Sequence, residues 1–294
     1  IKYFYFVLLI TILILSVDAF IQFFSGENIF GFTVNGYRVS GFFNDEYILG
    51  SYLTRITPIL LTLFFFINKN EYKLPLILIS ILSFLTILIS GERTAFGISI
   101  FFYFLLFFLV IDFDFKKKIF LFVTLIISLI FIFISSEKLR ERYIKTTLFQ
   151  IEATIGNYKT SEHFDDSENK EDLDMGLYNN QHIKHLKVSY EIFKERPFFG
   201  HGNRMFAQIC FERYFVNDGR CSTHPHNFLA QIFVENGLIG AIFYLSLFFC
   251  LTLYCYKAYK KNEKAIVVIL LICILSFFPF FPSGNFYNNM MSML

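Results

Sequence analysis

Long runs of apolar residues, separated by polar connections, dominate this chain. Crossing the hydrocarbon core of a bilayer as a helix takes about 20 mostly apolar residues, and continuous rather than alternating apolar runs favour helices over barrel strands. The pattern predicts an all-α, polytopic bundle with about seven spanning helices. The expected spans are residues 3–24, 48–67, 74–90, 95–111, 118–136, 238–256 and 265–282.

The composition excludes a soluble domain of this length. Hydrophobic residues make up 55% of the chain and charged residues 17%, with a mean hydropathy of +0.53. There is no basic tail or nucleic-acid motif, so membrane lipids and not nucleic acid are the expected surroundings. The chain begins without Met and ends inside an apolar run, which suggests a fragment. Three parts are expected: five helices in 1–136, a large loop in 137–237, and the last helices in 238–294.

Lysine is concentrated in alternate connections between the expected spans, at Lys69 and Lys73, at Lys116 to Lys118, and at Lys257 to Lys264. The positive-inside rule places these connections in the cytoplasm of a bacterial inner membrane and the others, including loop 137–237, in the periplasm. The six histidines all fall in this loop, at positions 163, 182, 185, 201, 224 and 226. We therefore expect the loop to carry function.

The two short outward connections contain arginine and no lysine. Arg38 and Arg93 lie in the first and second of them, and Arg55 lies about two turns inside the second span. An arginine at that depth is costly unless it reaches the interface, pairs or faces a polar cavity. Arg55 is therefore a candidate site residue.

The second half of the large loop predicts an amphipathic helix, ended by Pro197 and the Gly200-His201-Gly202 turn. This helix is expected to lie on the membrane or on the bundle. The residues expected on its apolar face are Ile183, Leu186, Tyr190 and Phe193, and those on its polar face are Lys184, Lys187, Glu191 and Lys194. Beyond it, we expect Cys210 and Cys221 to form a disulfide, because an oxidising compartment permits one.

The segment His224-Pro225-His226-Asn227 predicts the start of a helix. Pro225 prevents a helix from continuing through it, and Asn227 is a suitable N-cap, so His226 is expected at the mouth of this helix. A histidine there can act as a general base near neutral pH, or it can simply be a capping residue at the interface. A metal site with the His182/His185 pair lacks a recognisable set of further ligands, so no metal or cofactor is expected.

These residues resemble the bacterial O-antigen ligase and O-antigen polymerase superfamily. His226-Asn227 with Gly237 and Gly240 matches the signature His-Asn, nine residues, Gly, two residues, Gly. Further similarity lies in the preceding turn (Pro197, Gly200, Gly202), in Ser90-Gly91-Glu92-Arg93-Thr94-Ala95, and more weakly in 38–53 and 282–289. The resemblance covers most of the chain.

The resemblance implies metal-independent transfer of a glycan from undecaprenyl pyrophosphate to a sugar hydroxyl at the outer side of the inner membrane. It implies Arg93 as the residue that stabilises the pyrophosphate and His226 as the base. Ligases carry another arginine at the start of the amphipathic helix, where this chain has His182 and Lys184, which favours a polymerase. The residues assigned to substrate binding are Arg38, Arg55, Lys184, Arg204 and Asn227.

Ligase and polymerase remain open at this point, with lipid A-core or a growing glycan as the acceptor and a chain-length regulator as a partner of a polymerase. A metal-dependent transferase would use carboxylates of the first outer loop, where Asp45 and Glu46 lie. A lipid-linked glycan flippase is the non-enzyme alternative. It should show charges along several spans and internal repeats, which the sequence lacks.

Overall fold

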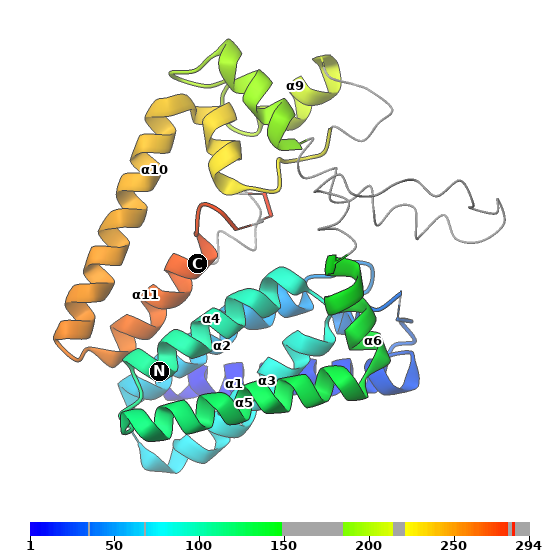
Figure 1. The fold of residues 1–294 in the computed structure, drawn as a ribbon, viewed down its shortest axis with the longest axis vertical. Helices are drawn as coiled ribbons and strands as arrows, with labels where there is room; N and C mark the ends of the chain where they lie inside the picture. The colour runs from blue at the N-terminus through cyan, green and yellow to red at the C-terminus, as the bar shows by residue number, and fades with distance from the viewer. Residues whose placement is uncertain (35, 68, 149–184, 214–220, 282–283, 286–294) are drawn as a thin grey trace. The chain divides into compact units, whose positions relative to one another are not determined.

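The computed structural model describes residues 1–34, 36–67, 69–148, 185–213, 221–281 and 284–285. The candidate residue Lys184, His182 and most of the weak match at 282–289 lie outside these ranges. Figure 1 shows the order of the elements. The α-helices are α1 (Lys2–Ser25), α2 (Leu49–Ile67), α3 (Lys73–Ile89), α4 (Arg93–Leu109), α5 (Phe115–Ser135), α6 (Glu137–Arg140), α9 (Met205–Arg213), α10 (Phe228–Lys260) and α11 (Lys264–Ser276).

The predicted all-helical class is confirmed for the described residues, whose β-structure amounts to an isolated bridge between Glu27 and Thr33. Residues 185–195 are also helical, and short helical turns lie at η1 (Gly41–Phe43), η2 (Asn70–Tyr72) and η3 (Glu141–Lys145). Five helices are long and apolar enough to span a membrane: Lys2–Ser25, Leu49–Ile67, Asn70–Ile89, Phe115–Ser135 and Phe228–Lys260. The other two expected spans coincide with the shorter apolar helices α4 and α11. Seven spans therefore stays a prediction.

The chain divides into two compact units. Unit 1 comprises Ile1–Tyr143 with Cys250–Ser276, and unit 2 comprises Ile144–Phe249 with Phe277–Leu294. The helix α11 belongs to unit 1 because it packs beside α2 and α4 (Figure 1).

Unit 1 is held together by hydrogen bonds between its apolar helices as well as by packing. The hydroxyls of Thr57 and Ser83 are 2.6 Å apart between α2 and α3, and Thr54 Oγ1 lies 3.0 Å from Ser99 Oγ between α2 and α4. Bonds of this kind join helices in lipid, where water competes little for the same donors. These two hydrogen bonds hold α2 against α3 and α4.

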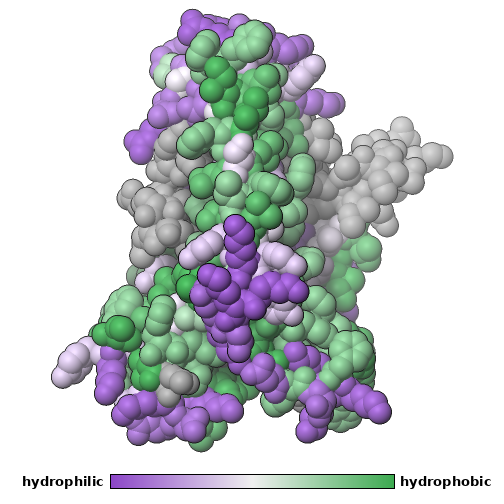
Figure 2. All heavy atoms as spheres, turned by 90° about the vertical axis from the view of Figure 1, so that its left-hand side faces the viewer, coloured by the Kyte–Doolittle hydropathy of each residue, from purple (hydrophilic) through white to green (hydrophobic). Residues whose placement is uncertain are grey.

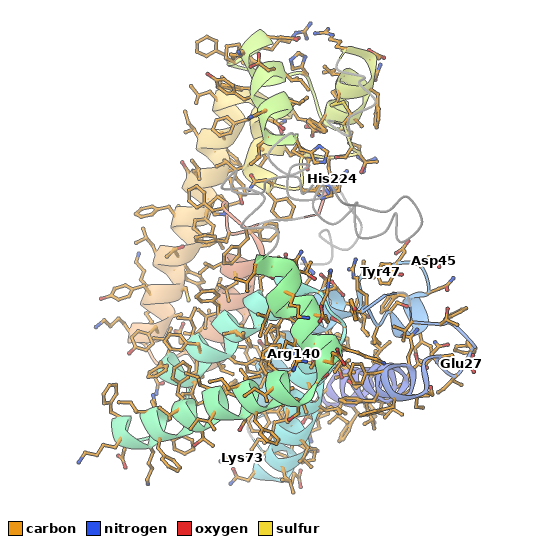
Figure 3. The ribbon with its side chains drawn as sticks, turned by 45° about the vertical axis from the view of Figure 1, so that its right-hand side comes forward. Glu27, Asp45, Tyr47, Lys73, Arg140 and His224 are labelled. Atoms are coloured by element: carbon orange, nitrogen blue, oxygen red, sulfur yellow. A yellow bond between two sulfur atoms is a disulfide. The ribbon has the colours of Figure 1, made fainter. Side chains whose placement is uncertain are left out.

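The lysine-rich connections of unit 1 lie at one end and its arginines at the other. Tyr5 Oη donates to Tyr72 O near the start of α3, and Lys264 forms an ion pair with Asp112 after the end of α4. Because α3 and α4 run in opposite directions, these contacts share one end of the unit. Figure 3 shows Lys73 at this end and Tyr47 at the opposite end. The separation agrees with the predicted orientation, which remains a prediction.

The loop between α1 and α2 is anchored by buried polar side chains of α1. Gln22 Oε1 accepts hydrogen bonds from Ser40 N (3.1 Å) and Gly41 N (2.7 Å). The fully buried Asp18 accepts from Ile29 N and from Asn28 Nδ2, both at 3.2 Å. These bonds fix the segment that carries Arg38.

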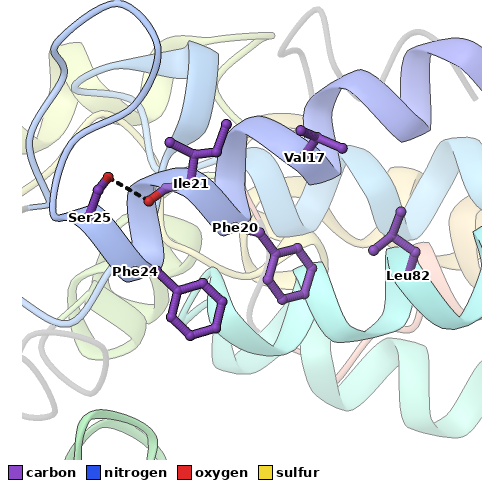
Figure 4. A pocket seen from close by; sticks show the side chains of 6 residues that line it. All are labelled: Val17, Phe20, Ile21, Phe24, Ser25 and Leu82. Carbon is purple, nitrogen blue, oxygen red and sulfur yellow. Dashed lines mark hydrogen bonds between the residues drawn. The ribbon is translucent and has the colours of Figure 1, made fainter.

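A shallow groove of about 550 Å³ lies on the surface of α1 and α3 (Figure 4). Its lining residues are Val17, Phe20, Ile21, Phe24, Ser25 and Leu82. The Ser25 hydroxyl donates to Ile21 O at 2.7 Å, so its polar group is satisfied within α1. The groove therefore offers apolar surface, as expected for a face that meets lipid chains.

Unit 2 contains a sharp kink in α10 at Gly237, with φ 65° and ψ −164°. In an uninterrupted helix, Leu238 N and Ile239 N would donate to the carbonyls of residues 234 and 235. Here they donate to Pro197 O (2.7 Å) and Phe198 O (3.2 Å). His201 N and Gly202 N occupy the vacated carbonyls of Val234 (3.0 Å) and Glu235 (2.8 Å). Backbone groups of the turn 197–202 thus replace two backbone hydrogen bonds within α10.

Two glycines make this exchange sterically feasible. A Cβ on Gly237 would lie 2.3 Å from Phe198 O, and a Cβ on Gly200 would lie 2.4 Å from the carbonyl carbon of Glu235. Both residues also have positive φ, which favours glycine. The Pro197 turn of one family motif and Gly237 of the other are therefore parts of one structural lock between α10 and residues 197–202.

The amphipathic helix is described over residues 185–195, and its predicted polar residues Lys187, Glu191 and Lys194 are exposed. Leu186 and Tyr190 are 45% and 60% exposed, whereas Val188 and Ile192 are buried in a small core with Phe206 of α9. The helix buries the side that meets α9 and the kink, and this choice depends on tertiary packing rather than on the apolar stripe alone. Leu186 and Tyr190 lie on the surface, and their contact with the membrane stays a prediction. The helix α10 also presents a continuous hydrophobic surface (Figure 2).

Candidate active site

Glu92 is the central residue of the first candidate site. It is the N-cap residue of α4 and only 9% exposed. Its Oε1 accepts a hydrogen bond from Gly50 N, and its Oε2 accepts from Ser51 N (3.2 Å) and Ser51 Oγ (2.6 Å). The first backbone N–H groups of a helix have no acceptor within that helix. Glu92, at the start of α4, supplies the acceptor for the N–H groups of Gly50 and Ser51 at the start of α2. Burial raises the pKa of this carboxyl, and the bonds from Ser51 and Gly50 and the charge of Arg38 oppose that rise.

The Glu92 cluster consists of Glu92 and three predicted arginines: Arg38 and Arg55, which interact electrostatically with Glu92, and Arg93, which follows it in the chain. Arg55 Nη1 donates to Ser51 O at 2.8 Å, and its charge acts on Glu92. Arg93 follows Glu92 as the first residue of α4 and is half-buried. The sequence indicated each arginine separately, and the structure places all three at the end of unit 1 where α2 and α4 begin.

Arg38 is held over an aromatic ring. Its guanidinium carbon lies 4.2 Å from the ring centre of Tyr47, and its Nη2 donates to Tyr47 O at 3.1 Å. Its Nε is buried and has no hydrogen-bond partner among the described residues. A fixed guanidinium with an unsatisfied donor is suited to binding an anion.

Two further residues at this end of unit 1 were missed by sequence reasoning. Arg142 Nε donates to Gly91 O at 3.0 Å, and Tyr143 Oη donates to Leu88 O at 2.9 Å. The signal that could have found Arg142 is the one that found Arg38 and Arg93, an arginine in a connection expected to face outward.

His226 is the central residue of the second candidate site, in unit 2. It lies just before α10 with φ 57°, a left-handed conformation that histidine tolerates better than most residues. Its ring centre lies 4.1 Å from that of His224 and 5.4 Å from that of His185, which is 4% exposed. The side chain of His226 itself is partly exposed. The structure thus supplies a histidine ring held between two others and open to solvent on part of its surface.

Asn227 caps α10, as the sequence predicts. Its Oδ1 accepts from Ala230 N at 2.9 Å, and its Nδ2 donates to Pro279 O at 3.0 Å. Both ends of the amide are therefore engaged in fixing the backbone next to His226. This arrangement gives Asn227 a positioning role, while its assignment to substrate binding stays a prediction.

The remaining predicted residues of unit 2 lie elsewhere. Arg204 is exposed, with φ 63°, just before α9, whose Phe206 N donates to the buried Glu235 at 3.4 Å. The helical stretch between His226 and Glu235 is about 13 Å long, so Arg204 lies at its other end. Cys210 and Cys221 form a disulfide with a Cα separation of 5.6 Å. Among the described residues, no group of three or more His, Cys, Asp or Glu side chains is arranged to hold a metal ion.

Comparison with known families gives one match. The model of the family described as O-Antigen ligase matches residues 78–245, more than half of the chain. The chain belongs to the O-antigen ligase family. It is therefore a membrane glycan transferase of the O-antigen ligase or polymerase type, which acts on a lipid-linked glycan and an acceptor. The matched range of this family member contains Arg93, Arg142 and His226. No curated protein matches the chain.

Proposed function

We propose that this family member transfers an oligosaccharide from undecaprenyl pyrophosphate to a sugar hydroxyl at the outer face of the bacterial inner membrane. The observation that carries the proposal is that two arginines, Arg38 and Arg55, interact electrostatically with the buried Glu92, and Arg93 follows Glu92 at the start of α4. Three guanidiniums and a single acid leave excess positive charge, which a polyanionic ligand would neutralise.

The leaving group explains the need for arginine. When the bond between the anomeric carbon and the pyrophosphate oxygen breaks, negative charge grows on the pyrophosphate. Guanidiniums remain protonated and bind phosphate oxygens in pairs, and Arg93 also lies at the N-terminus of α4, where helix amides favour anions. Arg93 is therefore the primary residue for stabilising this charge, with Arg38 and Arg55 beside it.

The acceptor requires a base. A sugar hydroxyl that attacks the anomeric carbon must lose its proton, and His226 is the proposed acceptor of that proton. The new bond joins the acceptor oxygen to the anomeric carbon, the proton passes to His226, and the pyrophosphate leaves with the electrons of the broken bond. Asn227 fixes the backbone next to His226, and the His185 ring lies beside its imidazole, with 5.4 Å between ring centres. Neither step needs a metal or an organic cofactor.

The acceptor is either lipid A-core, for a ligase, or a growing glycan, for a polymerase that works with a chain-length regulator. Arg204 and Lys184 are proposed contacts for the glycan. The separation of lysines and arginines to opposite ends of unit 1 supports an outward-facing Glu92 cluster.

A genetic complementation experiment tests this function and separates the two activities. The gene is deleted and restored as wild type or as His226→Asn, and surface lipopolysaccharide is compared on a gel. Lipid A-core bearing a single repeat with the variant indicates a polymerase, whereas bare core with accumulated lipid-linked polymer indicates a ligase. A normal ladder with the variant would remove His226 from the mechanism.

A further inference from the structure

Arg142 lies next to the Glu92 cluster through the backbone of Gly91. Its Nε donates to Gly91 O at 3.0 Å, and a Cβ on Gly91 would lie 3.6 Å from Arg142 Cγ and 3.4 Å from Arg38 Cγ. The two arginine stems therefore flank the same glycine, which directly precedes Glu92.

The segment that presents Arg142 is held firmly in place. Arg142 and Tyr143 belong to η3, a π-helical turn, and such turns occur frequently at functional sites. Tyr143 Oη donates to Leu88 O, and its ring packs edge-on against Phe96 (5.1 Å between centres) and Phe133 (5.6 Å). A side chain next to such an anchor pays little further entropy when it binds a ligand.

Tyr143 lies in a region of excess positive charge. Burial raises the pKa of its phenol, and the charges that act on it are those of Arg142, Glu92, Arg93 and Arg38, in decreasing order. Three arginines and one carboxylate thus act electrostatically on a single phenol. This excess of positive charge at a half-buried position suits a ligand with several negative charges.

We propose that Arg142 is a further guanidinium of the anion site and that it reads the second phosphate of the lipid-linked donor. The inference rests on the proposed function, because it assigns a residue to the donor subsite of that function. If Arg142 binds the second phosphate, the site should favour a lipid with a pyrophosphate group over a lipid with one phosphate.

The test measures binding of unglycosylated lipids to the purified full-length protein in phosphatidylcholine nanodiscs. The probes are undecaprenyl pyrophosphate, undecaprenyl phosphate and phosphatidylglycerol. The variants are Arg142→Ala and Arg142→Lys, and the matched control is Arg140→Ala, since Arg140 Nη1 donates to Ile134 O and is not part of the site (Figure 3).

Wild type and Arg140→Ala are expected to prefer undecaprenyl pyrophosphate over the monophosphate. In Arg142→Ala this preference should fall about tenfold or more, with Arg142→Lys between the two. An equal loss of affinity for both undecaprenyl lipids would show that Arg142 only supports the structure, and it would overturn the inference while leaving the donor assignment intact. If wild type binds phosphatidylglycerol as well as the pyrophosphate lipid, the donor assignment fails and the inference fails with it. Should Arg142→Ala not fold, the same comparison is made with Arg142→Lys.

Discussion

At the scale of single residues, backbone conformation decides which substitutions are informative. His226 has φ 57°, where most side chains are strained by about 1–2 kcal/mol and asparagine is among the best tolerated. An alanine at this position would combine the loss of the imidazole with backbone strain. Asparagine removes the base and keeps the local conformation.

His226→Asn is therefore expected to reduce glycan transfer by about 100-fold or more while the protein keeps its thermal stability. The measurement is the transfer rate of the purified variant beside its melting temperature in the same detergent. A folded His226→Asn protein with a rate near that of wild type would rule out a catalytic base at this position.

Gly237→Ala tests the lock between α10 and the turn 197–202. A Cβ at Gly237 would meet Phe198 O at 2.3 Å, so the substitution is expected to destabilise the protein by about 3 kcal/mol or more. Gly97→Ala in α4 is the control, because a Cβ there meets no atom within 4 Å, and its effect should stay within about 1 kcal/mol. Similar unfolding curves for the two variants would show that the kink tolerates a side chain.

At the scale of elements, Glu92 joins the start of α2 to the start of α4. Glu92→Ala removes the acceptor for Gly50 N, Ser51 N and the Ser51 hydroxyl, and it should cost about 2 kcal/mol in unfolding free energy. Glu92→Gln keeps an oxygen acceptor and should cost much less. Denaturant unfolding in detergent measures both, and equal losses would show that the charge matters more than the hydrogen bonds.

The pH dependence of stability at Glu92 has a definite sign. Burial raises the pKa of Glu92 above its ordinary value of 4.5, so the folded protein holds this proton more tightly than the unfolded chain. Its contribution to stability is complete below about pH 4.5 and is lost as the pH rises through the raised pKa. The stability of wild type relative to Glu92→Gln should therefore increase as the pH is lowered from about 7 to about 5. A constant difference would contradict this shift.

The sequence predicted the helices better than their contacts. Each expected apolar run became a helix, because burial in lipid requires a backbone satisfied within its own segment. The packing of Val188 and Ile192 in helix 185–195 was not predicted, because it depends on contacts with α9 and the kink, which are distant in the sequence. The motif glycines were recognised, but their partnership with Pro197 and Phe198 depends on a contact between distant segments. Arg142 was missed for the same reason.

At the scale of the whole molecule, orientation in the membrane is the central prediction. The lysine-rich end of unit 1 is expected in the cytoplasm and the Glu92 cluster outside. In a background lacking the free cysteines Cys250, Cys255 and Cys273, a membrane-impermeant maleimide should label Asp45→Cys in intact spheroplasts and should label Lys73→Cys only after lysis (Figure 3). Labelling of Lys73→Cys in intact spheroplasts, with labelling of Asp45→Cys only after lysis, would show the opposite orientation.

Glycan transfer from a pyrophosphate-linked donor is expected to depend on the arginines of the Glu92 cluster. The most direct test supplies purified protein in liposomes with the undecaprenyl-pyrophosphate-linked repeat unit and an acceptor, and it quantifies both released undecaprenyl pyrophosphate and elongated or ligated glycan. Wild type should form both products in equal amounts, and Arg93→Ala should lower both together by about 100-fold or more. Undiminished turnover by a folded Arg93→Ala protein, or glycan transfer without release of the pyrophosphate lipid, would contradict the account.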